Sequence, residues 1–161
     1  MAEVSLRPIT QKNFAECISL KVADDQIALV ASNVKSLAEA YVNPTLHPLG
    51  IYDASAHYEN SPVLIGFAMY ELVDAVGFVM RLMIDKACQG QGYGRAAMIE
   101  VIRRLRLHPE VEIIATSHLR ENEAAARLYE GLGFVDWETE WTSEIPHERY
   151  MILKEQAGTS S

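Results

Sequence analysis

Hydrophobic and polar positions follow two different periods along this chain of 161 residues. An apolar run at residues 4–9, interrupted at Pro8, predicts an edge strand, because proline cannot donate a hydrogen bond to a sheet. Apolar positions then recur every three to four residues, which is typical of amphipathic helices. Short helices are therefore predicted ahead of the next prolines, over residues 11–20, 25–30 and 36–41.

Beyond Pro44 and Pro48 the chain becomes rich in β-forming residues. Apolar runs separated by turn-like segments predict strands. The predicted strands lie at residues 49–52, 63–72, 77–84, 111–116, 135–141 and 149–153, with turns at 53–62, around Asp74 and at Pro146. Two helices interrupt them: a long one over 93–107 with a continuous apolar stripe, and a shorter one over 123–130.

The predicted order is strand, helices, three strands, helix, strand, helix and two strands. This order departs from the strict alternation of a doubly wound fold, so it predicts an α/β protein with a mixed sheet. A length of 161 residues suits one compact domain, which is expected over residues 1–156. Residues 157–161 form a short polar tail that is expected to be disordered.

The chain is acidic, with 22 Asp and Glu against 14 Lys and Arg and a formal net charge of −8. Such a surface repels nucleic acid and weakly favours cationic partners, although acidity also serves to keep a protein soluble. Charge therefore argues against a nucleic-acid partner and selects no substrate by itself.

Nothing in the sequence indicates a membrane or secreted location. No run approaches the roughly 18 apolar residues that cross a bilayer, and the first ten residues lack the layout of a secretion signal. Only Cys17 and Cys88 are present, and no Cys/His spacing suits a metal. We expect a cytoplasmic protein with no membrane partner and no bound metal.

The most specific local feature is a glycine loop between an apolar strand and the long helix. Glycines at 90, 92 and 94 allow a phosphate to approach the backbone N–H groups that a helix start leaves without partners. Side chains of Gln89, Gln91 or Arg95 could add contacts to phosphate oxygens. The alternative is a glycine-rich turn that merely lets the chain reverse between strand and helix.

The spacing of the loop separates it from two common phosphate-binding motifs. A Walker loop needs Lys followed by Ser or Thr, whereas Arg95 and Ala96 follow here, and the Rossmann fingerprint needs a different third glycine. The pattern Gln-x-x-Gly-x-Gly resembles the acetyl-CoA pyrophosphate loop of the GNAT superfamily of N-acetyltransferases. The cofactor-binding residues that this resemblance implies in the loop are Gln89, Gly90, Gln91, Gly92, Tyr93, Gly94 and Arg95.

A second segment, from Asn122 to Phe134, resembles the other GNAT hallmark: Asn, two residues, Ala, two residues, Leu-Tyr, then Gly-Phe. Asn122 and Tyr129 lie seven residues apart, so a helix brings both to nearly the same face. In a purely structural interpretation, Asn122 caps the helix and Tyr129 is a half-buried aromatic.

The resemblance implies a fold and a chemistry. It implies a central mixed, splayed sheet of about six to seven strands flanked by about four helices, with the splay between the strand ending at Ile84 and the strand at 111–116. Acetyl-CoA is then the co-substrate, with its pantetheine arm along Leu82, Met83 and Ile84, and Asn122 contributes to its site. Tyr129 is the general acid that protonates the CoA sulfur, and a backbone N–H near Met83 or Ile84 polarises the thioester carbonyl.

The base that deprotonates the acceptor amine is less clear. Glu71, on the strand before the splayed one, is the first candidate, although a solvated charge at a strand end explains it as well. His118 and Asp85 are weaker candidates. Cys88 lies beside the glycine loop, but no activating partner is visible, so a structural role is expected.

Residues 20–41 and 66–70 resemble those of bacterial spermine/spermidine acetyltransferases, which implies a small cationic amine as substrate. Acidic residues Asp24, Asp25 and Glu39, with Glu71 opposite, could bind its ammonium groups. The alternatives are another amine (a protein N-terminus, an aminoglycoside or an amino acid) or a CoA-binding sensor without turnover, against which Tyr129 and the intact loop argue. The exposed closing strands make a homodimer plausible.

Overall fold

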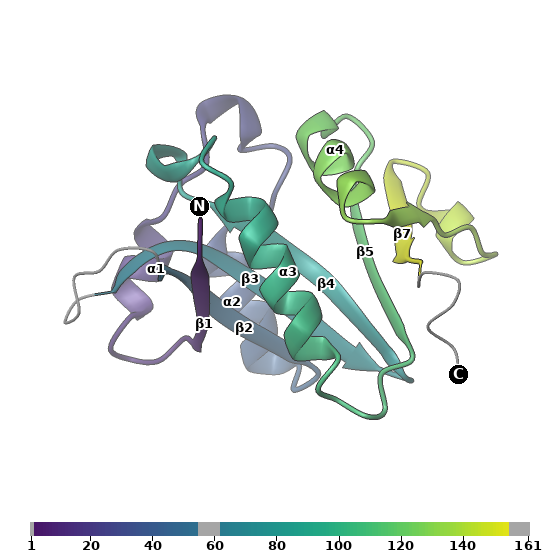
Figure 1. Cartoon of the computed structure of the whole chain (residues 1–161), viewed down its shortest axis with the longest axis horizontal. Helices are drawn as coiled ribbons and strands as arrows, with labels where there is room; N and C mark the ends of the chain where they lie inside the picture. Colours follow the sequence, from purple (N-terminus) through teal and green to yellow (C-terminus); the bar gives the residue numbers. More distant parts are fainter. Residues whose placement is uncertain (1, 55–61, 155–161) are drawn as a thin grey trace.

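The computed structural model, which describes residues 2–54 and 62–154, contains one mixed seven-stranded sheet in the order β1-β2-β3-β4-β5-β7-β6 (Figure 1). The strands are β1 (Val4–Pro8), β2 (Leu46–Asp53), β3 (Val63–Val73), β4 (Val76–Ile84), β5 (Ile113–Leu119), β6 (Phe134–Asp136) and β7 (Glu148–Leu153). The helices are α1 (Phe14–Ser19), α2 (Asn33–Val42), α3 (Tyr93–Leu105) and α4 (Glu123–Gly131), with 3-10 turns η1 (Asp24–Gln26), η2 (Lys86–Cys88) and η3 (Thr142–Glu144). The predicted fold class is confirmed.

The sheet has two antiparallel parts joined by one parallel pair. Strands β1 to β4 form an antiparallel meander, and β5, β7 and β6 form a second antiparallel group. Between them, β4 and β5 pair in parallel over four rungs only, from Val76 opposite Ile113 to Val79 opposite Thr116. Beyond these rungs the two strands diverge, as the predicted splay requires.

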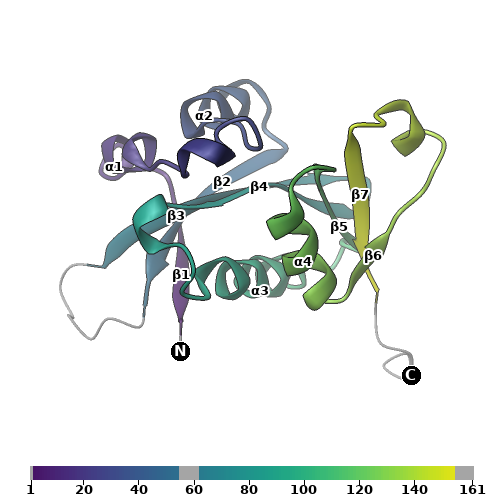
Figure 2. The ribbon, with the colours of Figure 1, turned by 90° about the horizontal axis from the view of Figure 1, so that it is seen from above.

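Helices cover both faces of the sheet. Figure 2 shows α1 and α2 on one side and α3 on the other, with α4 beside β5. The predicted apolar stripe of α3 is buried in the larger core, and its members are Met98, Val101, Ile102 and Leu105. On the opposite face, Cys17 of α1 packs in a second core with Phe67 and Met69 of β3. Each face of the central strands therefore has its own core.

Two predicted elements are wrong in extent. Residues 25–30 do not form a helix, and only the short 3-10 turn Asp24–Gln26 is present. The closing strand predicted at 135–141 ends at Asp136, because Thr139 and Thr142 exchange hydrogen bonds that fold the following segment into a turn. The predicted tail at 157–161 and most of the turn at 53–62 lie outside the described residues.

The strand predicted at 49–52 begins earlier, at Leu46, and so includes Pro48. Proline is tolerated there because the ladder between β1 and β2 ends at Leu49, so no β1 carbonyl needs a donor from Pro48. Among the described residues, no helix is long and apolar enough to span a membrane, and no group of three or more His, Cys, Asp and Glu could hold a metal ion. Both cysteines are free thiols.

Candidate active site at the fork of the sheet

The glycine loop leaves the backbone amides at the start of α3 open to a ligand. Gly90 and Gly92 have φ angles of 78° and 86°, in the left-handed region that favours glycine, and Gly92 caps the helix. The first hydrogen bond of the helix runs from the amide of Ala96 to the carbonyl of Gly92. The amides of Tyr93, Gly94 and Arg95 precede that bond, so they have no carbonyl within the helix and can cradle an anion.

The longer side chains of the loop either have partners within the protein or are exposed. Gln89 Nε2 donates to Gln26 Oε1 at 2.8 Å and to the carbonyl of Ile84 at 3.0 Å, which ties the loop to η1 and β4. Tyr93 Oη donates to Asp53 Oδ2 at 2.8 Å. Gln91 and Arg95 are exposed and line a hollow beside the N-terminal segment. The geometry therefore favours an anion held by backbone amides, with Gln89 positioning the loop.

Two cavities meet at the fork between β4 and β5. The loop cavity, of about 280 Å³, lies next to the glycine loop, and the strand cavity, of about 540 Å³, extends from the fork along β5 and β7. The residues that line both include Leu82, Met83, Asn122 and Tyr129. A ligand that enters from the loop and one that enters along β5 would therefore meet beside these side chains.

The edge of β4 that faces the fork offers backbone groups of Leu82 and Ile84. The amide of Asp85 donates to the carbonyl of Ile65 of β3. In an antiparallel pair, the backbone N–H and C=O groups of every second residue point toward the partner strand. Met83 therefore bonds toward β3, whereas Leu82 and Ile84 face the side where β5 has diverged. The interaction of Ile84 O with Gln89 agrees with this orientation. Met83, which sequence analysis placed on the same backbone edge, contributes its side chain instead.

Tyr129 of α4 lies at the base of the fork and is only 6% exposed. Its phenol lies beside the hydroxyl of Thr116, which donates to the carbonyl of Val79 at 2.8 Å. Burial raises the pKa of Tyr129 above its ordinary value, and the nearby Thr116 opposes this shift. The phenol is therefore protonated at neutral pH, as a proton donor must be.

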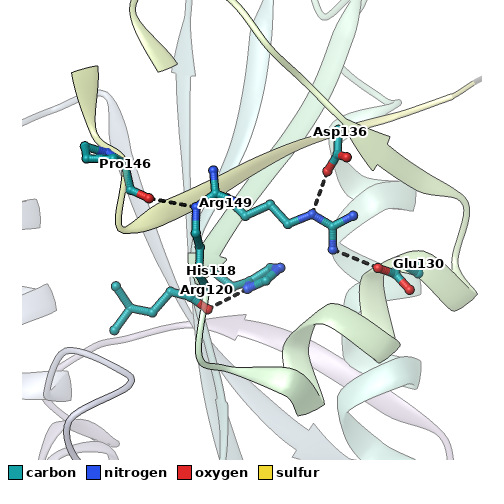
Figure 3. A network of polar contacts seen from close by, with 7 residues as sticks. His118, Arg120, Glu130, Asp136, Pro146 and Arg149 are labelled. Atoms are coloured by element: carbon teal, nitrogen blue, oxygen red, sulfur yellow. Dashed lines mark hydrogen bonds and ion pairs between the residues drawn. The ribbon is translucent and has the colours of Figure 1, made fainter. Parts of the chain in front are cut away.

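Helix α4 is fixed at both ends. At its start, Asn122 Oδ1 accepts from the amide of Ala125 at 3.2 Å, so Asn122 is a helix cap that also lines both cavities. Near its end, Arg149 of β7 reaches Glu130 of α4 at 2.7 Å and Asp136 of β6 at 2.6 Å (Figure 3). These contacts hold the helix that carries Tyr129 against β6 and β7.

The strand cavity contains a carboxylate that sequence analysis did not identify. Glu148 Oε2 accepts from Ser117 Oγ at 3.1 Å. The neighbouring Tyr150 has its pKa raised to about 12, first by burial and then by the charge of Glu148 and a hydrogen bond with it. Only the register of β5 against β7, which sets Tyr150 opposite Ser117, brings these three residues onto one face.

His118 also lines the strand cavity and is 7% exposed. Its Nδ1 lies 2.7 Å from the carbonyl of Leu119, and because a carbonyl only accepts, Nδ1 carries the hydrogen (Figure 3). Nε2 is then the nitrogen with the free lone pair, and it has no hydrogen-bond partner among the described residues. The imidazole ring lies 6.0 Å from that of Tyr129, centroid to centroid.

The other acidic candidates lie outside both cavities. Glu71 faces Leu46 near the end of β3 that is remote from the glycine loop, and it accepts from Thr45 Oγ1 at 3.2 Å. Asp85 caps η2 through the amide of Ala87 and accepts from the amide of Lys21. Glu39 pairs with Arg81 at 3.2 Å. Asp24 and Asp25 are exposed on η1. The structure therefore does not bring the predicted acidic residues together around one substrate.

Cys88 lines the loop cavity, but its environment does not activate it. Burial raises the pKa of its thiol, and the negative charges of Asp85 and Asp53 raise it further. A thiol with a raised pKa carries little thiolate at neutral pH and is a poor nucleophile. This agrees with the structural role expected for it.

Comparison with known proteins places this geometry among acetyltransferases. The model of the acetyltransferase (GNAT) family matches residues 46–134, from β2 through the glycine loop to Phe134. A probable spermine N(1)-acetyltransferase of Bacillus subtilis subsp. natto is 29% identical over 139 residues, which cover 81% of this chain and 87% of the relative.

Two solved structures share the fold. The aminoglycoside acetyltransferase AAC(6')-Ib, in complex with coenzyme A and kanamycin, has a TM-score of 0.71 and 22% identity over 96% of each chain. The spermidine N-acetyltransferase of Vibrio cholerae, in complex with CoA and spermine, has a TM-score of 0.67 and 15% identity over 93% of each chain. At these sequence identities, the similarity to the two structures shows a shared fold and nothing more specific.

Proposed function

The chain belongs to the GNAT family of acetyltransferases, and from this premise we propose that it transfers the acetyl group of acetyl-CoA directly to a primary amine, with a polyamine such as spermidine or spermine as acceptor. The observation that carries the proposal is the position of Tyr129. Its side chain lies where the loop cavity meets the strand cavity, so a proton donor stands between the places for the two substrates.

The loop cavity fits coenzyme A in its chemistry. The amides of Tyr93, Gly94 and Arg95 suit a pyrophosphate, and the left-handed φ angles of Gly90 and Gly92 set the backbone that presents them. Leu82 and Ile84 offer backbone groups to an amide-containing arm that lies along β4, in the gap where β5 no longer pairs. An N–H on this edge can also polarise a thioester carbonyl, an effect typically worth ~3 kcal/mol.

Acetyl transfer requires one proton to be removed and one to be supplied. We assign removal to His118, whose Nε2 is buried beside Tyr129 without a hydrogen-bond partner among the described residues and would accept a proton from an amine that reaches it through the strand cavity. As the nitrogen–carbon bond forms and the carbon–sulfur bond breaks, Tyr129 gives its proton to the departing thiolate. The histidine and the phenolate then return to their starting states by proton exchange with solvent.

The assignment of a polyamine as acceptor is supported by the names of the relatives and by the negative charge of one residue in the strand cavity. The relative from Bacillus subtilis subsp. natto carries the name of a probable spermine N(1)-acetyltransferase. In this chain, Glu148 places a carboxylate in the strand cavity, where a cationic amine would need one. Glu71, Asp24 and Asp25 take no part, because they line neither cavity.

The test combines calorimetry with an acceptor screen. We expect purified protein to bind acetyl-CoA and to release CoA, measured as free thiol, with spermidine and spermine. The panel also contains an aminoglycoside, an amino acid and a peptide with a free N-terminus. Release with one of these and not with polyamines would overturn the acceptor assignment. Binding of acetyl-CoA without transfer to any amine would instead identify a sensor.

A further inference from the structure

Glu148 stands at the boundary between two cavities. It lines the strand cavity together with Tyr129, and it lines a third cavity of about 830 Å³, here called the outer cavity, together with Trp137 and Glu140. Tyr150 lies on the same boundary. An elongated ligand that extends from Tyr129 into the outer cavity must therefore pass Glu148.

The carboxylate of Glu148 is oriented but not neutralised. Ser117 donates a hydrogen bond to it, the phenol of Tyr150 lies beside it, and both groups are uncharged. Among the described residues, Glu148 forms no ion pair. Arg81 pairs with Glu39, Arg149 pairs with Glu130 and Asp136, and Arg120 of the outer cavity donates to the carbonyl of Pro146. The remaining cation of the strand cavity, Lys35, is exposed. Because a carboxylate accepts about four hydrogen bonds, Glu148 keeps capacity for a further donor.

Aromatic rings stand beside this carboxylate. Tyr150 contacts Trp141 with a centroid distance of 5.0 Å and Phe78 with one of 6.0 Å, and Trp137 stacks edge-on against Trp141 at 5.3 Å. Aromatic faces attract an ammonium group, and the attraction adds to that of a neighbouring carboxylate. A carboxylate held by neutral donors next to aromatic rings is a combination that suits a partly desolvated cation.

We propose that Glu148, held by Ser117 and Tyr150, binds a second, non-reacting ammonium group of the acceptor and so selects amines with two or more amino groups over monoamines. The inference rests on the proposed function, because it places the reacting amine at Tyr129. The rest of a longer polyamine would then extend toward Glu138 and Glu140, which form no ion pair among the described residues.

The experiment compares the activity of two variants, each lacking one carboxylate, toward a diamine and a monoamine of the same carbon chain. We measure kcat/KM for 1,4-diaminobutane and for butylamine, which share a carbon chain and differ in the second amine. Glu148→Gln removes the charge, and Glu144→Gln removes an equal charge from an exposed position on the preceding segment. We expect Glu148→Gln to lower the diamine-to-monoamine ratio about tenfold, as the loss of one charged hydrogen bond predicts, and Glu144→Gln to leave it unchanged.

Supporting measurements separate this inference from the proposed function. Ser117→Ala and Tyr150→Phe each remove one hydroxyl beside Glu148 and should lower the same ratio by a smaller factor. Calorimetric binding of the diamine, which needs no turnover, should weaken with Glu148→Gln and stay unchanged with Glu144→Gln. An equal loss for both amines, or unchanged diamine binding, overturns the inference. Absence of transfer by the unmodified enzyme to any amine overturns the proposed function, and the binding comparison still decides the role of Glu148.

Discussion

Tyr129 lies beside Thr116, which occupies the last rung where β4 and β5 are still paired. Thr116 is fully buried and donates to the carbonyl of Val79, so the phenol lies against the point where the sheet divides. The position of the Tyr129 side chain therefore depends on the sheet as well as on its own helix.

Replacement of Tyr129 by Phe tests its role as proton donor. We expect turnover to fall about 10²- to 10⁴-fold, because the thiolate then leaves without a proton from the enzyme. The affinity for acetyl-CoA should change little, since the ring and its packing remain. Thiol release and calorimetry measure the two quantities separately. Unchanged turnover would remove Tyr129 from the mechanism.

Substitutions of Gly92 and Gly94 distinguish two roles of the glycines: to adopt a left-handed backbone conformation, and to leave room for the ligand. Gly92→Ala places a side chain at φ 86°, so we expect a loss of about 1 kcal/mol in the free energy of unfolding together with weaker acetyl-CoA binding. At Gly94, a Cβ would lie 3.8 Å from Leu128 in ordinary contact, so Gly94→Ala should leave stability unchanged.

Gly94 nevertheless lines the loop cavity, so its added methyl group should lower the affinity for acetyl-CoA. Denaturant unfolding and calorimetry report the two effects. Gly131→Ala serves as a control, because a Cβ there meets nothing within 4 Å and φ is not positive. Full affinity in Gly94→Ala would place the cofactor elsewhere.

His118→Asn tests the proposed proton acceptor. The amide oxygen and nitrogen of Asn do not reproduce Nε2, so we expect turnover to fall about 10²-fold with acetyl-CoA affinity unchanged. Added imidazole should restore part of the activity if the missing group is a base. A structural role would instead lower thermal stability and acetyl-CoA binding, without rescue by imidazole.

Alkaline stability should depend on Cys17. Burial raises the pKa of this fully buried thiol from 9.0 to about 11. Below pH 9 the thiol is protonated in both states, so its contribution to stability is complete. Between pH 9 and 11 only the unfolded chain ionises, and stability should fall by about 2–3 kcal/mol. Denaturant unfolding at pH 8, 10 and 11 measures the loss, which Cys17→Ala should abolish.

The central elements could be predicted because several local signals agree there. In the stretch from Val76 to Leu105, apolar alternation, glycine chemistry and a helical stripe all indicate strand, loop and helix. The segment after Asp136 gave conflicting signals. Trp137 and Trp141 favour a strand, but reciprocal bonds between Thr139 and Thr142 produce a turn that their β propensity does not reveal.

The residues predicted to bind the cofactor come from local motifs, whereas the carboxylate of the proposed acceptor site was not predicted from sequence. Gly92, Asn122 and Tyr129 belong to such motifs, and all three line the loop cavity. Glu148 and Ser117 lie on different strands and meet only through the register of β5 against β7. Glu71, the carboxylate predicted for the acceptor, lies outside both cavities, because its position on β3 brings it to Thr45, which the sequence does not indicate.

Within the part of the chain that the structure describes, the four rungs between β4 and β5 are the only ladder between the two halves of the sheet. One half carries the glycine loop, and the other carries Tyr129 and Glu148. The glycine loop and Tyr129 therefore lie on two parts of the fold that the sheet connects only through the short pairing that ends at Val79 and Thr116. We therefore expect a substitution of Val79, which lines neither cavity, to change the distance between the glycine loop and Tyr129 without replacing a residue of the proposed site.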